Sequence, residues 1–166
     1  MRLVIIGPNG AGKDTLARLI REHSGLRYPE SSSLTWAREI EAWQDGRDMA
    51  DWWSRRRDHR EEWIDQALQL RLRKGSTAMA QICFASADIY TGIRTSEELV
   101  AILDECLIDL VVWCWNPGQR ALHGIDMLPE QAADLTLQSS RPWIVAQADT
   151  TGAQRIQRFV RCWEDT

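Results

Sequence analysis

The sequence predicts an α/β fold, a three-layer α/β/α arrangement with a mainly parallel sheet between two layers of helices. Short apolar segments alternate with amphipathic ones along the 166 residues, which is the order that βαβ units require. The apolar segment 2–6 also breaks into a glycine-rich stretch, residues 7–12, directly ahead of a helical pattern. With 44% hydrophobic residues, a chain of this length is expected to form one domain over residues 1–166.

The first half of the chain is predicted to be mostly helical after its first strand. Residues 2–6 are predicted as a buried parallel strand and 13–23 as the following helix, and apolar residues at 36, 40 and 43 indicate a helix over 34–43. Residues 48–73 are expected to be mainly helical, with Gly75 as the stop and a further helix over 76–85. The candidate core positions within 48–73 are Trp52, Trp63, Ile64, Ala67, Leu68 and Leu72.

Strands and helices alternate in the second half. Strands are predicted over 87–93, 107–115 and 142–146, where the chain is apolar. The segment Thr95-Ser-Glu-Glu98 is a capping-box pattern, which predicts a helix to about residue 105. A short helix beginning near Pro129 and an amphipathic helix over 153–163 complete the pattern, and the polar segment of about 116–130 is a candidate lid.

Composition excludes several classes of protein. The net charge of −4 argues against a broad surface for nonspecific DNA binding, because such surfaces are built from clustered cations. No apolar run approaches the ~18–20 residues of a membrane helix, so we expect no membrane partner and a cytoplasmic protein. Cys83, Cys106, Cys114 and Cys162 show no C-x-x-C pairing, and we expect buried thiols rather than a zinc site or disulfides.

The glycine-rich stretch predicts a phosphate-binding loop. Gly7, Gly12 and Lys13 satisfy the spacing G-x-x-x-x-G-K, in which backbone N–H groups surround phosphate oxygens and the lysine reaches the β- and γ-phosphates. The next position normally carries Ser or Thr as a Mg²⁺ ligand, but here it is Asp14, followed by Thr15. The residues expected to bind ATP are Asn9, Gly10, Ala11, Gly12, Lys13, Asp14 and Thr15.

Companion motifs favour a small kinase among proteins with such a loop. A base-reading N-K-x-D element, expected of a switch GTPase, is absent, and no predicted strand ends in the acidic pair expected of a motor ATPase. Residues 47–74 carry eight cations and six acids, and five of the nine tryptophans lie between Trp36 and Trp63. Such a region could bind an anionic acceptor and stack a nucleobase.

Two segments resemble the phosphate-binding loop and a second motif of bacteriophage deoxynucleoside monophosphate kinases. They are Gly7–Thr15, with Asp after the lysine, and Thr91–Leu99, which is similar to the family element with an acid or glycine, a hydrophobic residue, Arg and a following Glu. The resemblance implies transfer of the γ-phosphate of ATP, with Mg²⁺, to a deoxynucleotide. Many relatives carry an acid where this chain has Gly92, which leaves Asp88 or Asp14 to serve the metal with Thr15.

Roles for further residues follow from this resemblance and from the predicted sheet. Arg94 follows a strand at the carboxyl edge, where ligands bind, although a salt bridge to Glu97 or Glu98 is the alternative. Arg120 is the candidate lid arginine. The helical insertion over about 34–75 is expected to bind the acceptor through Arg38, Arg56, Arg57, Arg60 and Trp52.

Alternatives stay open at this point. A related branch of phage kinases phosphorylates 5-hydroxymethyldeoxyuridine within DNA, so the partner is either a free nucleotide or DNA carrying a modified base. A nucleotide-binding protein without transfer activity is a further alternative, given Asp14 and Gly92. A homodimer is possible, and a phage-encoded protein would work in the host cytoplasm.

Overall fold

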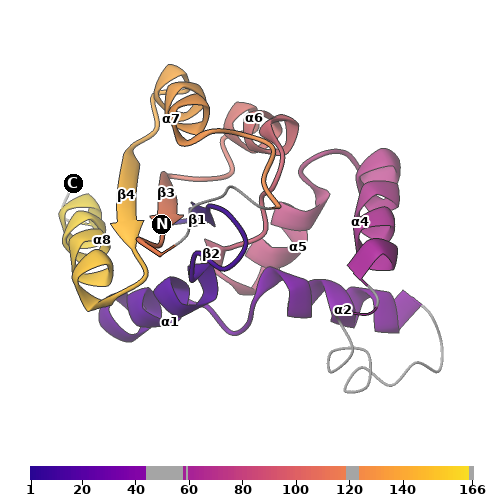
Figure 1. The fold of residues 1–166 in the computed structure, drawn as a ribbon, viewed down its shortest axis with the longest axis horizontal. Coiled ribbons are helices and arrows are strands. Elements are labelled where there is room, and N and C mark those ends of the chain that lie inside the picture. Colours follow the sequence, from indigo (N-terminus) through magenta and orange to yellow (C-terminus); the bar gives the residue numbers. More distant parts are fainter. Residues whose placement is uncertain (44–57, 59, 119–123, 165–166) are drawn as a thin grey trace.

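A four-stranded parallel sheet forms the centre of the protein (Figure 1). The structure is a computed structural model that describes residues 1–43, 58, 60–118 and 124–164. Its strands are β1 (Leu3–Ile6), β2 (Ile89–Tyr90), β3 (Leu110–Trp115) and β4 (Trp143–Gln147). They pair in the order β2-β1-β3-β4, and every neighbouring pair is parallel. The predicted α/β class with a parallel sheet is therefore confirmed.

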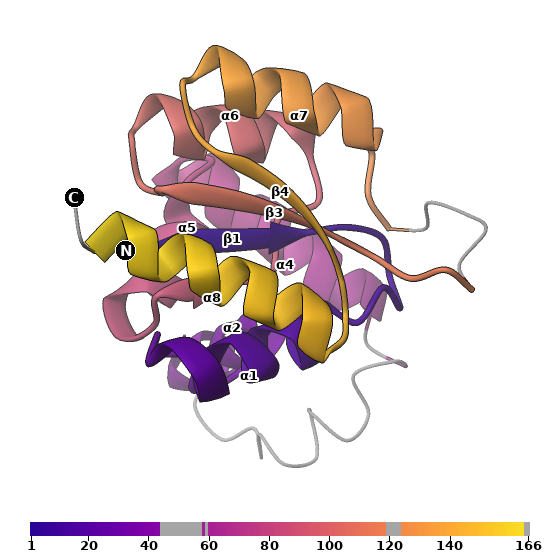
Figure 2. The same ribbon diagram turned by 90° about the vertical axis from the view of Figure 1, so that its left-hand side faces the viewer.

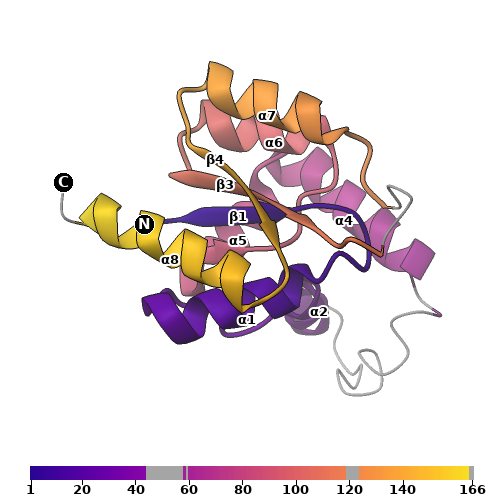
Figure 3. The same cartoon turned by 60° about the vertical axis from the view of Figure 1, so that its left-hand side comes forward.

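Helices cover both faces of this sheet (Figures 2 and 3). Helices α1 (Lys13–Ser24) and α8 (Thr150–Glu164) lie on one face, and α6 (Ser96–Asp104) and α7 (Pro129–Gln138) on the other. Helices α2 (Ser32–Trp43), α4 (Arg60–Lys74) and α5 (Ala78–Ser86) extend the fold beyond the β2 edge (Figure 1). Among the helices of the described ranges, none is long and apolar enough to cross a membrane.

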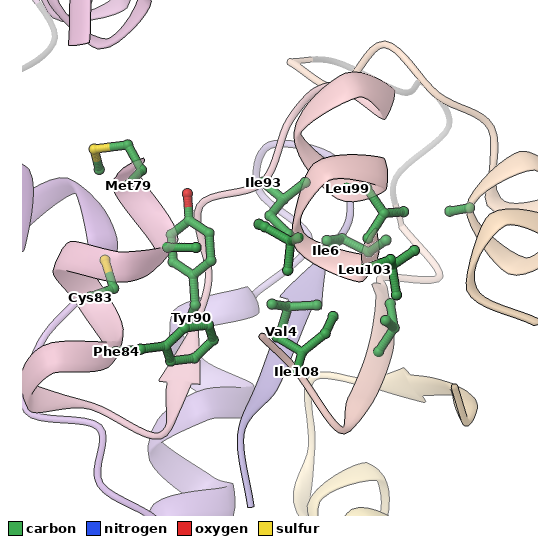
Figure 4. Packing of buried hydrophobic residues seen from close by; sticks show 14 of the residues in the cluster. Val4, Ile6, Met79, Cys83, Phe84, Tyr90, Ile93, Leu99, Leu103 and Ile108 are labelled. Atoms are coloured by element: carbon green, nitrogen blue, oxygen red, sulfur yellow. The ribbon is translucent and has the colours of Figure 1, made fainter. Parts of the chain in front are cut away.

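Alternation along β1 sends its side chains into two separate cores. Leu3 and Ile5 pack with α1 and α8, whereas Val4 and Ile6 belong to the cluster on the opposite face. All four side chains are fully buried, as expected for a central parallel strand covered on both sides. Figure 4 shows the second cluster, in which Tyr90 lies beside residues of α5 and the α6 leucines lie over β1.

Most predicted elements are confirmed with small changes at their ends. The strand expected over 87–93 is wrong in length, because only Ile89–Tyr90 pair and the chain then leaves the sheet. Thr95 caps α6 as predicted, since its side chain accepts a hydrogen bond from the Glu98 N–H. Most of the helical segment predicted before residue 60 lies outside the described residues.

Two predictions about burial need correction. Leu68 and Leu72 were expected in the core, but they are 48% and 71% exposed, and Leu70 is the buried leucine of α4. Ala67 is partly buried, whereas Trp52 and the side chains of Trp63 and Ile64 lie outside the described residues. Cys83 and Cys114 are buried as expected, but Cys106 and Cys162 are exposed.

Candidate functional site

The glycine-rich loop, residues 7–12, joins the carboxyl end of β1 to the amino end of α1. Gly12 caps α1 with φ +89°, and a Cβ there would lie 2.5 Å from the Cβ of Ala148. Gly7, at φ +144°, lies directly against the backbone carbonyl of Cys114 in β3. Only glycine fits these two positions, so the loop follows the end of the sheet closely. The free N–H groups at the start of α1 make this end of the helix favourable for an anion.

The ammonium group of Lys13 lies across the loop. Its Nζ donates hydrogen bonds to the carbonyl oxygens of Gly7 and Pro8, both at 2.8 Å. An ammonium has three donors, so one remains for a ligand. Burial, together with the nearby charge of Arg94, lowers the pKa of Lys13 to about 8. The group therefore carries its charge at neutral pH, and a bound phosphate would stabilise that charge.

Two hydroxyl groups hold the carboxylate of Asp14. Its Oδ1 accepts hydrogen bonds from the Tyr28 hydroxyl at 2.7 Å and from the Thr91 hydroxyl at 3.1 Å. Tyr28 is buried, and burial and the charge of Asp14 raise its pKa above the ordinary value, so it remains a protonated donor. Both of these bonds go to one oxygen, which leaves Oδ2 as the candidate ligand for a cation.

Asp14 and Thr15 fit the chemistry of a Mg²⁺ site. A carboxylate and a hydroxyl are hard oxygen ligands, and both residues line the same cavity as Lys13. In the described part of the chain, no group of three or more His, Cys, Asp and Glu side chains could hold a metal ion. This is compatible with Mg²⁺, which commonly keeps several waters and binds through one or two protein ligands and substrate phosphates.

Arg94 joins the loop to a segment far away in the sequence. Its Nη1 donates to Oδ1 of Asn9 at 2.9 Å and to the carbonyl oxygen of Gly124 at 3.0 Å. The Asp126 N–H in turn donates to the Arg94 carbonyl at 3.0 Å. Because β1 and β2 are parallel neighbours, the segments that follow them meet at the same edge of the sheet. The predicted position of Arg94 beside the loop is therefore confirmed, while its role stays a prediction.

A cavity of about 980 Å³ begins at the loop and continues between α2, α4 and α5. The loop end is lined by Asn9, Gly10, Gly12, Lys13, Asp14, Thr15 and Arg94, together with Gly124–Asp126. The other end, here called the helical end, is lined by Ser32, Ser33 and Trp36 of α2, by Ala67, Leu68 and Arg71 of α4, and by Met79 of α5. Tyr90, which ends β2, and the following Thr91 and Gly92 lie between the two ends.

A buried ion pair supports the helical end. Arg71 Nη2 lies 2.8 Å from Oε2 of Glu98, and the Tyr90 hydroxyl donates to Oε1 of Glu98 at 2.7 Å. Glu98 is almost fully buried, and burial raises its pKa above the ordinary value, although Arg71 and Tyr90 favour the carboxylate. The pair links α4 to α6 and fixes the orientation of the Arg71 guanidinium.

The structure brings together the loop residues and Arg94, but not every predicted residue. Ala11 is fully buried behind the loop, where its carbonyl accepts a hydrogen bond from Cys114 Sγ at 3.2 Å. Arg38 is an exposed partner of Glu30 at 2.6 Å and is not among the residues that line the cavity, so its expected contact with the acceptor stays a prediction that this cavity does not support. Trp52, Arg56, Arg57, Arg120 and the side chain of Arg60 lie outside the described residues.

The prediction that Asp88 would hold the metal is also corrected. Asp88 directly precedes β2, and its carbonyl accepts from the Leu3 N–H at the start of β1. Its carboxylate binds the backbone N–H and the guanidinium of Arg27, with an ion pair at 2.7 Å that lowers the pKa of Asp88. The loop follows the other end of β1, so the sheet separates Asp88 from Asp14.

Sequence reasoning missed three residues that now stand out: Tyr28, Thr91 and Arg71. Thr91 could have been found, because it lies near the carboxyl end of the strand predicted over 87–93 and so near the carboxyl edge of the sheet. Tyr28 and Arg71 carry no such signal, since their positions depend on how two loops and a helix pack. Comparison of the chain with protein-family models, with curated proteins and with solved structures finds no match.

Proposed function

We propose that this protein is an ATP-dependent kinase that transfers the γ-phosphate of ATP to a deoxynucleotide, with a free deoxynucleoside monophosphate as the acceptor. The observation that carries the proposal is that one continuous cavity runs from the glycine-rich loop, across which the Lys13 side chain lies, to the helical end. A protein that only binds a nucleotide needs the loop end alone, whereas phosphoryl transfer needs a donor site and an acceptor site side by side, which the loop end and the helical end would provide.

The loop end suits the donor triphosphate. The backbone N–H groups at the start of α1 and the remaining N–H of the Lys13 ammonium would bind its phosphate oxygens. Arg94 adds a second cation at the loop end. Positive charge at this point would stabilise the negative charge that the transferred group carries between donor and acceptor.

Asp14 and Thr15 are the residues proposed to hold Mg²⁺ with the phosphates. When bound, the ion would neutralise phosphate charge and orient the transferred group. Tyr28 and Thr91 would then act as positioning residues, because their hydroxyls fix one carboxylate oxygen of Asp14. An enzyme of this kind would work in the cytoplasm, where ATP and nucleotides are found.

The test is phosphoryl transfer from γ-labelled ATP with Mg²⁺. The acceptors are the four deoxynucleoside monophosphates, dUMP, and DNA that contains 5-hydroxymethyluracil. We expect label in one or more free nucleotides. Label in the DNA alone would replace the proposed acceptor, and ATP binding without any labelled product would indicate a nucleotide-binding protein.

The chain provides a matched control for the lysine. Lys13→Met should abolish transfer and weaken ATP binding by about tenfold or more, since a charge-assisted hydrogen bond is lost. Lys74→Met changes the other lysine of the sequence, which is exposed at the end of α4, and should leave both phosphoryl transfer and ATP binding unchanged. Equal effects of the two substitutions would contradict the proposed role of the loop.

A further inference from the structure

Two buried N–H donors at the helical end of the cavity have no hydrogen-bond partner among the residues that the structure describes. They are Nε1 of Trp36 and Nε of Arg71, and both residues line the cavity. Trp36 is only 6% exposed, so its indole N–H is withdrawn from bulk solvent. Buried donors are normally satisfied, and a pair of unsatisfied ones beside a cavity indicates a ligand that supplies acceptors.

The positive charge of Arg71 is already balanced at this end. Its Nη2 binds Glu98 at 2.8 Å, and Glu98 is almost fully buried. A second anion would therefore meet a neutral pair here, whereas Lys13 and Arg94 supply positive charge at the loop end. The free Nε–H of Arg71 is thus better suited to a neutral acceptor, such as a carbonyl oxygen, than to a phosphate.

The remaining walls of the helical end suit a flat aromatic ring. Ala67, Leu68 and Met79 line it together with the Trp36 ring, and of the described residues at this end only Ser32 and Ser33 add side-chain hydroxyls. Among the described residues, no carboxylate or carboxamide side chain lines this end. Side-chain groups that would accept hydrogen bonds from an exocyclic amino group are therefore scarce, while donors are present.

We propose that the helical end binds a nucleobase with a keto oxygen at pyrimidine C4 or purine C6, as thymine, uracil and guanine have, in preference to cytosine or adenine, which carry an amino group there. Trp36 Nε1–H and Arg71 Nε–H donate to acceptors on the edge of the base. The inference rests on the proposed function, since it takes the ligand to be a nucleotide. It also orients that nucleotide, because a base at the helical end leaves the 5′-phosphate to point toward the loop.

The orientation favours a free nucleotide as the source of the base. A hydroxymethyl group on the base could receive a phosphate only if the base itself lay beside Lys13. A base held between α2 and α4 is instead placed for transfer to its own 5′-phosphate. Binding to single-stranded oligothymidylate, measured beside binding to dTMP, distinguishes DNA from the free nucleotide as the source.

The experiment measures equilibrium binding of dTMP, dUMP, dGMP, dAMP and dCMP without ATP, and of ADP separately. The nucleotides with that keto oxygen, dTMP, dUMP and dGMP, are expected to bind about tenfold or more tightly than dAMP and dCMP, because an amino group in place of the oxygen leaves at least one of the two donors unpaired. Trp36→Phe keeps an aromatic ring but removes the N–H, and should remove about tenfold of the affinity for the keto nucleotides alone. Trp143→Phe, at a partly buried position that packs against Trp113, is the matched control and should keep the wild-type preference.

A second variant covers the case in which Trp36→Phe does not fold. Arg71→Lys retains a cation for Glu98 but lacks the Nε–H, so it should lower the preference for dTMP, dUMP and dGMP over dAMP and dCMP. Equal affinities across the five nucleotides, tighter binding of dAMP or dCMP, or no binding of any of them would overturn the inference. If ADP still binds in those cases, the proposed donor site at the loop stands and the phosphoryl-transfer assay decides the acceptor; if ADP does not bind, the proposed function itself fails.

Discussion

At position 14 the chain places a carboxylate where a phosphate-binding loop normally carries a hydroxyl, and the surrounding residues match this exchange. The hydroxyls of Tyr28 and Thr91 both donate to Oδ1 of Asp14, so the carboxylate is oriented by residues from two other segments. A carboxylate beside a phosphate is unfavourable unless a cation lies between them, because the two negative charges repel. If the loop binds a nucleotide as proposed, we expect that binding to depend more on Mg²⁺ than it would with a hydroxyl at this position.

The positioning role of Thr91 can be tested with one substitution. Thr91→Val removes a hydrogen bond to a charged group at nearly constant side-chain volume. The observed orientation of the Asp14 carboxylate should therefore lose about 1–2 kcal/mol of stabilisation. The Mg²⁺ concentration for half-maximal phosphoryl transfer should rise several-fold, with little change in binding of metal-free ADP. Thr136→Val, in which the lost hydroxyl binds a carbonyl within α7, is the control. Equal metal dependence in the two variants would contradict the role.

A second prediction at the residue scale concerns Gly92, where many of the resembling kinases carry an acid. A Cβ at this position would lie 2.5 Å from Cε2 of Tyr90 and 2.7 Å from Oγ of Ser32. No side chain fits there without moving the backbone or the buried Tyr90, so Gly92→Ala should destabilise the protein by about 1–3 kcal/mol. Urea unfolding measures the change. Gly118→Ala meets only an ordinary contact and should be close to neutral, and equal midpoints for both variants would contradict the steric argument.

Among the elements, the link between α4 and α6 is the one with the clearest energetic consequence. Arg71 is partly exposed, but Glu98 is not, so removal of Arg71 strands a buried carboxylate. Glu98 can avoid this by taking up a proton, because its pKa is already raised by burial and would rise further without Arg71. The cost of losing Arg71 should therefore depend on pH.

The sign of that pH dependence follows from linkage. In Arg71→Met the pKa of Glu98 is higher in the folded than in the unfolded protein, so stability falls as pH rises from the unfolded value through the folded value. The loss relative to wild type should approach about 3–5 kcal/mol at pH 8 and be smaller at pH 5. Thermal unfolding at the two pH values measures it. Arg73→Met, an exposed change on α4, should show no such dependence, and a pH-independent loss in Arg71→Met would contradict the argument.

At the scale of elements, the sequence allowed good prediction wherever a periodic pattern or a cap was present. The helix after the loop, the α6 cap at Thr95 and the buried strand β3 follow from local pattern alone. The length of β2 did not, because Thr91 and Ile93 are buried without pairing as a strand. The exposed leucines of α4 were also misassigned, since the face of a helix that is buried depends on its neighbours.

For the whole molecule, the site was harder to predict than the fold. The loop is contiguous in sequence, so its residues could be named in advance, and the parallel sheet places Arg94 beside it. The helical end is assembled from α2, α4 and α5, and no local signal shows that Trp36 and Arg71 share a cavity. Arg38 was chosen for its charge, but its partner is Glu30.

Helices α2 and α4 share one core with the sheet, which predicts a single unfolding transition. Trp36 of α2 and Leu70 of α4 are buried in the same cluster as Val4 and Ile6 of β1. Unfolding followed by far-UV circular dichroism and by tryptophan fluorescence should therefore give coincident curves.

ADP with Mg²⁺ at about 100 times its dissociation constant should raise the midpoint of both unfolding curves by roughly 5–10 °C. Lys13→Met should remove most of this shift at the same ADP concentration, while Lys74→Met should keep it. Two separate transitions, with ADP raising only one, would mean that the α2–α4 segment folds independently of the sheet.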